Sequence, residues 1–129
     1  MTAPLHPPKS GDALLAGGSG LIGREIARHW YSTEDLTPGC WPKRVAQALP
    51  GLRQWVQAQQ QRLRVAPAAT CLGGFSQGAV LALALALQDD GIAGRVLSFG
   101  GCLSTPPLAA PRHTTLHLLH GADDGVIPA

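Results

Sequence analysis

A G-x-S-x-G pentapeptide at residues 74–78 constrains the fold of this chain more than any other feature. A short apolar run ending at Leu72 precedes it, and residues 79–87 after it are all alanine, valine or leucine. A strand, a sharp turn and a helix in this order form the context in which such a serine stands exposed at the end of a sheet. Glycines on both sides remove Cβ atoms that would collide in the turn, and the N–H groups of the following helix favour negative charge beside the serine. The pattern predicts a nucleophile elbow with Ser76 at its tip.

Segments with strand and helix character alternate along the rest of the chain. The expected elements are a helix over residues 43–63 with a kink or restart at Pro50, a strand over 68–72, a helix over 77–88 stopped near Gly91, a strand over 95–100, a loop over 102–112 and a strand over 114–119. Alternating strands and helices favour a parallel sheet with helices on both faces. The predicted fold class is therefore α/β.

Composition excludes several classes of protein. With 129 residues, 45% of them hydrophobic and 14% charged, the chain can build one core and does not resemble a disordered protein. A net charge of +2, scattered along the chain, does not indicate a nucleic-acid-binding surface. The apolar stretch at 79–87 is about half of what a membrane span needs, and the N-terminus lacks a signal-peptide pattern. We therefore expect a cytoplasmic protein with no membrane span.

The cysteines do not indicate a disulfide framework or a zinc site. Cys40, Cys71 and Cys102 are an odd number, widely spaced, without a C-x-x-C pair. Cys71 and Cys102 are interpreted as small buried apolar residues. No metal or organic cofactor is expected.

A second motif follows the last expected strand. Residues 119–128 read Leu-His-Gly-Ala-Asp-Asp-Gly-Val-Ile-Pro. In an open α/β sheet, functional groups gather beyond the carboxyl ends of the strands, where an acid can orient a histidine. Asp123 and Asp124 come 47 and 48 residues after Ser76, on the next strand but one. Taken alone, the segment fits a solvated Asp-Asp-Gly turn equally well.

The two motifs together, Gly74-Phe75-Ser76-Gln77-Gly78-Ala79 and His120-Gly121-x-x-Asp124-x-Val126-Ile127-Pro128, resemble the phospholipase/carboxylesterase family of α/β-hydrolases. This family includes acyl-protein thioesterases and small bacterial serine esterases. The resemblance implies a partial α/β-hydrolase fold that hydrolyses small carboxylic esters or thioesters through an acyl-serine. It makes Ser76 the nucleophile, Asp124 the acid and the backbone N–H of Gln77 an oxyanion donor. Trp30 and Tyr31 resemble the family's aromatic substrate loop. The implied division is an atypical segment over 1–29 and an incomplete esterase domain over 30–129.

The resemblance also implies a catalytic histidine a few dozen residues beyond the acid, whereas the sequence ends five residues after Asp124. The histidines present are His6 in the proline-rich tail, His29 near the substrate loop, His113 and His117 in or beside a strand, and His120 at the strand-end His-Gly step. None matches the family's base, and His120 is expected to be structural. We therefore expect absent or impaired activity, and open sheet edges that favour self-association.

Two alternatives remain open. Gly17, Gly20 and Gly23 fit G-x-x-G-x-x-G, and this stretch resembles the opening of an NAD(P)-dependent short-chain dehydrogenase or epimerase. The Tyr-x-x-x-Lys pair of those enzymes is missing, because Asp35 stands four residues after Tyr31, the only tyrosine. The other alternative is a non-catalytic module that binds acyl chains or esters without turnover.

Overall fold

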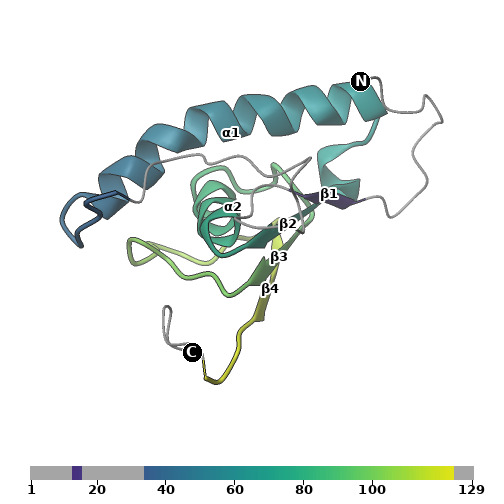
Figure 1. The fold of residues 1–129 in the computed structure, drawn as a ribbon. Coiled ribbons are helices and arrows are strands. Elements are labelled where there is room, and N and C mark those ends of the chain that lie inside the picture. Colours follow the sequence, from purple (N-terminus) through teal and green to yellow (C-terminus); the bar gives the residue numbers. More distant parts are fainter. Residues whose placement is uncertain (1–12, 16–33, 124–129) are drawn as a thin grey trace.

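A computed structural model describes residues 13–15 and 34–123 of the chain. Its elements follow in the order β1 (Ala13–Leu15), α1 (Trp41–Leu63), a 3-10 turn (Pro67–Ala69), β2 (Cys71–Phe75), α2 (Gln77–Gln88), β3 (Arg95–Phe99) and β4 (Thr115–Leu119). The strands form one parallel sheet in the order β1-β2-β3-β4 (Figure 1). The predicted α/β class with a parallel sheet is confirmed.

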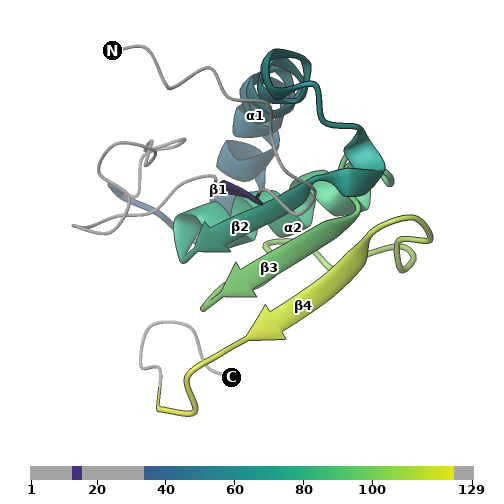
Figure 2. The same ribbon diagram turned by 90° about the vertical axis from the view of Figure 1, so that its right-hand side faces the viewer.

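Two helices cover one face of this sheet. α2 packs against β2 and β3, and α1 packs in turn against α2. Figure 2 shows α2 behind β2 and β3, with α1 above it. Any helix on the opposite face lies outside the described residues.

The core is centred on α2, which is buried on nearly all sides. Its interior side chains are small or aliphatic, among them Ala79, Leu81 and Leu85, each with no exposed surface. α1 contributes one apolar stripe at helical spacing, and its buried members are Val45, Leu49, Leu52 and Val56. Residues 77–88 were expected to form this central helix, and the structure confirms both ends. Gly91, the glycine expected near the stop of this helix, has φ 93° and lies in the turn that follows Gln88.

Pro50 does not divide α1, so the expected restart there is wrong. The helix runs through Pro50 and is 23 residues long in total. A proline inside a helix removes one backbone hydrogen bond and crowds the preceding turn. The buried stripe on both sides of Pro50 continues in phase, so packing against α2 offsets the local cost.

The strand that leads into the serine begins three residues later than expected, at Cys71 instead of Ala68. Residues Pro67–Ala69 form a 3-10 turn instead, in which Thr70 N donates to Pro67 O at 3.0 Å. Gly94 lies against this turn, and its N–H donates to the carbonyls of Pro67 and Thr70. A Cβ on Gly94 would come within 2.2 Å of Ala68 O, so only glycine allows this approach. The contact comes from a residue 27 positions after Pro67, which local sequence reasoning cannot include.

A buried amide joins α1 to the sheet layer. Gln60 is 7% exposed, and its Nε2 donates to Thr70 Oγ1 at 3.0 Å and to Ile92 O at 2.8 Å. Both hydrogen atoms of the amide therefore have partners, as a buried polar group requires. A glutamine among the polar residues of this helix would ordinarily face solvent, but Gln60 faces the interior.

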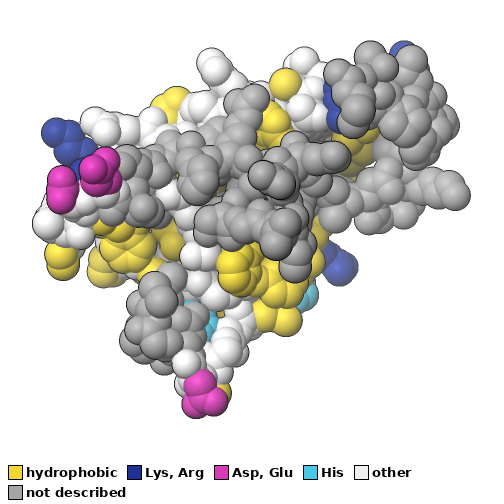
Figure 3. Space-filling model, viewed as in Figure 1, with side chains coloured by type: hydrophobic (Ala, Val, Ile, Leu, Met, Phe, Trp, Pro, Cys, Tyr) yellow, Lys and Arg dark blue, Asp and Glu magenta, His cyan; other side chains and the backbone are white. Residues whose placement is uncertain are grey.

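The sheet face away from the helices carries a row of exposed apolar side chains. Phe75, Phe99 and Leu119 are register partners on adjacent strands and are 56%, 40% and 46% exposed. In Figure 3, which has the same viewpoint as Figure 1, most of the described side chains in sight are hydrophobic or uncharged. The acidic and basic side chains lie near the outline of the molecule. Of the helices in the described segments, neither is long and apolar enough to cross a membrane.

Candidate active site

Ser76 occupies the sharp turn between β2 and α2 that the sequence predicts. Its backbone has φ 53° and ψ −112°, a combination that non-glycine residues rarely adopt and that costs about 1–3 kcal/mol. Two hydrogen bonds hold it there: Ser76 N donates to Phe99 O at 2.9 Å, and Val80 N donates to Ser76 O at 3.0 Å. The turn is therefore determined both by the neighbouring strand and by the first turn of α2.

Glycines allow β2, α2 and the end of β3 to meet at this turn. A Cβ on Gly74 would lie 2.4 Å from the carbonyl carbon of Gly78, in the first turn of α2. A Cβ on Gly101 would lie 2.5 Å from Ala79 Cβ and 2.6 Å from Ser98 Oγ. Gly74 belongs to the motif, but Gly101 was not identified from the sequence. The Gly100-Gly101 pair at the end of a strand is the signal that could have found it.

Gln77 is the first residue of α2, directly after the serine, and is half-buried. N–H groups in the first turn of a helix point towards its N-terminal end, where the helix dipole favours negative charge. The backbone N–H of this residue therefore belongs to the end of α2 that adjoins Ser76. This arrangement suits an oxygen that gains negative charge during attack by the serine.

The second motif begins at the same edge of the sheet as the serine. Phe75, Phe99 and Leu119 are aligned across β2, β3 and β4, so the residues that follow each strand leave the same carboxyl edge. As predicted, the acidic segment follows the second strand after β2, because β3 lies between β2 and β4. Asp123 is described and exposed, whereas Asp124 lies outside the described residues. The substrate-loop candidates Trp30 and Tyr31 and the glycines of the dinucleotide alternative also lie outside them.

The histidines are divided between described and undescribed parts of the chain. His113, His117 and His120 are described, whereas His6 and His29 are not. His117 lies in β4, and His120 is the residue directly after that strand. Within residues 13–15 and 34–123, no group of three histidine, cysteine or acidic side chains is arranged to hold a metal ion.

All three cysteines are free thiols, and they differ in their surroundings. Burial raises the pKa of the Cys71 and Cys102 thiols, although both are half-buried and not fully buried as expected. Hydrogen bonds with the side chain and backbone of Thr37 lower the pKa of the Cys40 thiol, with a smaller contribution from the Arg44 charge. Thr37 N donates to Cys40 Sγ at 3.2 Å.

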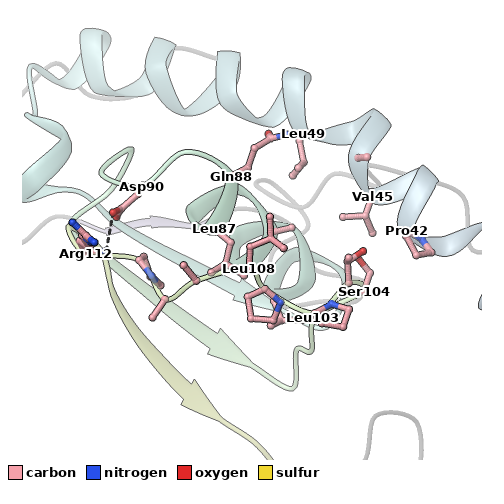
Figure 4. Close-up of a pocket in the computed structure, with 18 residues that line it drawn as sticks. Pro42, Val45, Leu49, Leu87, Gln88, Asp90, Leu103, Ser104, Leu108 and Arg112 are labelled. Atoms are coloured by element: carbon pink, nitrogen blue, oxygen red, sulfur yellow. Dashed lines mark hydrogen bonds between the residues drawn. The ribbon is translucent and has the colours of Figure 1, made fainter.

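An apolar groove of about 630 Å³ lies apart from the serine turn. Figure 4 shows Val45 and Leu49 of α1, Leu87 of α2, and Leu108 of the loop between β3 and β4 around it. None of residues 74–78 lines this groove, so its size does not make it the reaction site.

A carboxylate at one end of the groove holds the start of β4 in place. Asp90 accepts hydrogen bonds from the backbone N–H groups of Arg112, at 2.7 Å, and His113, at 2.9 Å. Desolvation is the largest influence on the pKa of this carboxyl and raises it, but the two hydrogen bonds and the nearby His113 charge together bring the pKa below its ordinary value.

Comparison with known proteins leads to the same family as the two sequence motifs. The model of the phospholipase/carboxylesterase family matches residues 19–129. Esterase YpfH of Escherichia coli (strain K12) is 37% identical over 127 residues, which cover 97% of this chain and 53% of that protein. The chain thus spans about half the length of this curated relative.

A solved structure shows the likeness in three dimensions. The crystal structure of esterase PE8 superimposes with a TM-score of 0.76 and 23% sequence identity, covering 98% of this chain and 77% of that one. At this identity the likeness establishes the fold alone. The strained serine turn, the parallel sheet and the family match over residues 19–129 lead to one conclusion: the chain belongs to the phospholipase/carboxylesterase family of α/β-hydrolases.

Proposed function

We propose that this chain carries the nucleophile of a serine hydrolase that cleaves carboxylic esters or thioesters through an acyl-serine intermediate. The observation that carries the proposal is the backbone of Ser76, held at φ 53° and ψ −112° between β2 and α2. Strain of this kind persists only where the surrounding structure enforces it, and it places the hydroxyl beside the N-terminus of a helix. The family match and the esterase relative support the same chemistry.

The proposed reaction proceeds in two balanced steps. Ser76 Oγ attacks the carbonyl carbon of the substrate while its proton passes to a base, and the tetrahedral oxygen is stabilised by the backbone N–H of Gln77. The alcohol or thiol leaves with a proton from the base, and water then hydrolyses the acyl-serine by the reverse sequence of proton transfers. Asp124 is the proposed acid that orients the base, and Trp30 and Tyr31 are the proposed contacts for the substrate.

The role of the N–H donor has an expected magnitude. Removing one such donor typically raises the barrier by about 3–4 kcal/mol. The Gln77 N–H cannot be removed by replacing its side chain. Its position depends on how α2 packs against β2, and this packing decides whether the N–H reaches the tetrahedral oxygen. The glycine contacts at Gly74 and Gly101 are therefore part of the proposed machinery.

Labelling by a fluorophosphonate tests the proposal on the purified chain. Ser76 Oγ would form a bond to phosphorus as fluoride leaves, and intact mass and peptide mapping would locate the adduct. Ser76→Ala should abolish the label, whereas Ser104→Ala, in the loop after β3, should keep it. Hydrolysis of p-nitrophenyl esters in the same samples measures turnover and tests the expectation of impaired activity. Ester binding without any adduct at Ser76 would favour the non-catalytic module, and an adduct on another serine in place of Ser76 would contradict the nucleophile assignment.

Self-association through the sheet is a second part of the proposal. Within the described part of the chain, β4 pairs with β3 alone, and its side chains Leu118 and Leu119 are 69% and 46% exposed. An open edge with exposed apolar residues is a site at which strands of other molecules can pair. Leu118→Lys should lower the association measured by sedimentation velocity, while an unchanged sedimentation profile would contradict a role for this edge.

A further inference from the structure

The apolar groove beside α1 has the size and lining of a site for a small amphiphile. Its volume of about 630 Å³ falls within the range of about 300–1,000 Å³ that is typical of ligand pockets. Val45 and Leu49 of α1 line it and are buried. On the loop after β3, Leu108 is fully exposed and Leu103 partly so. An apolar chain lying in the groove would therefore remove these two leucines from water, which is favourable.

Arg112 supplies a cation at one end of this groove. Figure 4 shows it beside Asp90, at the opposite end of the groove from Pro42. Its side chain is exposed, and within residues 13–15 and 34–123 it forms no salt bridge, since the pair found there joins Arg53 to Asp89. A guanidinium presents a planar fork of N–H donors that fits the two oxygens of a carboxylate.

The acidic side chains directly after α2 are already bound within the protein. Asp89 is paired with Arg53 at 3.1 Å. Each oxygen of Asp90 accepts a backbone N–H, one from Arg112 at 2.7 Å and the other from His113 at 2.9 Å. The Arg112 guanidinium is therefore the charge at this end that can receive an anion from solution.

We propose that the groove binds a medium-chain fatty acid, with the tail along its apolar walls and the carboxylate on Arg112. Arg112 precedes β4 at the amino ends of the strands, whereas Ser76 follows β2 at their carboxyl ends. The five residues of each strand lie between these two levels, which are therefore roughly 17 Å apart. The site is thus separate from the serine turn, and it goes beyond the proposed function.

Calorimetric titration of the full chain with dodecanoate, below its micellar concentration, tests the charged half of the site. Arg112→Gln keeps the backbone N–H that Asp90 accepts, and it should weaken binding at least about tenfold, because a charge-assisted pair is lost. Arg95→Gln removes the same charge from the exposed first residue of β3, outside the groove, and should bind within about twofold of the parent. Dodecanol, which has the same tail and no carboxylate, should bind at least about tenfold more weakly than dodecanoate.

The apolar half of the site has its own matched pair of variants. Leu108→Ser should weaken dodecanoate binding about tenfold, because the leucine that the tail would cover is gone. Leu118→Ser changes an exposed leucine of β4 that does not line the groove, and it should leave the affinity within about twofold. Both side chains are exposed, so both variants should melt like the parent.

Several results would overturn the proposal. Equal affinities of Arg112→Gln and Arg95→Gln, or dodecanol binding as tightly as dodecanoate, would show that the groove does not select a carboxylate. Equal losses in Leu108→Ser and Leu118→Ser would place the tail outside the groove. No binding by the parent, or a dimer in sedimentation velocity that Leu108→Ser abolishes, would show that the groove takes no fatty acid or is covered by a second copy.

Ser76→Ala separates this inference from the proposed function. This variant should bind dodecanoate like the parent, so a failure to label Ser76 would leave the fatty-acid site standing. Loss of dodecanoate binding in Ser76→Ala would instead place the ligand at the serine turn and overturn the separate site.

Discussion

Replacing Gly74 with alanine should separate the last residues of β2 from α2 and displace Ser76. A Cβ at this position would lie 2.4 Å from Gly78 C, 2.5 Å from Ala79 N and 2.5 Å from Gly78 O. All three are backbone atoms of the first turn of α2, so no side-chain rotation can relieve the contact. The helix must move by about 1 Å to reach an ordinary van der Waals separation.

The cost follows from what the movement disrupts. Overpacking in a core typically costs about 1–3 kcal/mol, and a rigid backbone neighbour places Gly74→Ala at or above the upper end. At about 4 °C per kcal/mol for a chain of this size, the melting temperature should fall by roughly 12 °C. Labelling at Ser76 should fall as well, because the Gln77 N–H moves with the helix. Circular dichroism melts and adduct mass spectrometry measure the two effects.

Gly51 provides the control for this substitution. It lies exposed within α1, and a Cβ there would meet no atom within 4 Å. Alanine is favoured over glycine in a helix by about 1 kcal/mol, so Gly51→Ala should raise the melting temperature by roughly 4 °C. A Gly74→Ala protein that melts within about 2 °C of the parent and keeps its label would show that the close contact between β2 and α2 is wrong.

Four further outcomes are expected. Ser76→Gly should be more stable to urea than Ser76→Ala by about 1–3 kcal/mol, because glycine accepts the positive φ without strain; equal midpoints would argue against a strained turn. Gln60→Leu should lower the free energy of unfolding by about 1–3 kcal/mol by leaving a buried carbonyl without its donor, and a neutral effect in urea melts would contradict the buried amide bridge. Folding lowers the pKa of Asp90, so this carboxylate stabilises the fold above the ordinary carboxyl pKa, and the stabilisation is lost as pH falls through the folded pKa. The difference in unfolding free energy between the parent and Asp90→Asn should therefore disappear below about pH 4. A difference that grows below that pH would contradict the lowered pKa. Iodoacetamide near neutral pH should modify Cys40 before the other two thiols, as peptide mass spectrometry can check, and an equal rate at all three would contradict its lowered pKa.

Local patterns in the sequence were sufficient wherever one segment determines its own conformation. The bounds of α2 follow from an unbroken apolar run between the serine motif and Asp89, and the turn at Ser76 follows from the glycines beside it. The parallel sheet follows from the alternation of elements, since short loops leave few other topologies. The family resemblance rests on the same two motifs and is confirmed over residues 19–129.

Contacts between distant segments decided what the sequence could not. β2 begins at Cys71 because Gly94 packs on the preceding turn, and Gln60 is buried because two later segments accept its hydrogen bonds. The alignment of the strand ends at Phe75, Phe99 and Leu119 depends on the register of three strands, and a shift of one residue in any of them would turn the side chains of that strand to the other face. Sequence alone determined which element each motif occupies, because hydrophobic periodicity and turn chemistry act within a few residues. Only the tertiary structure decided which groups face one another, because strand pairing and packing join residues that are far apart in the chain.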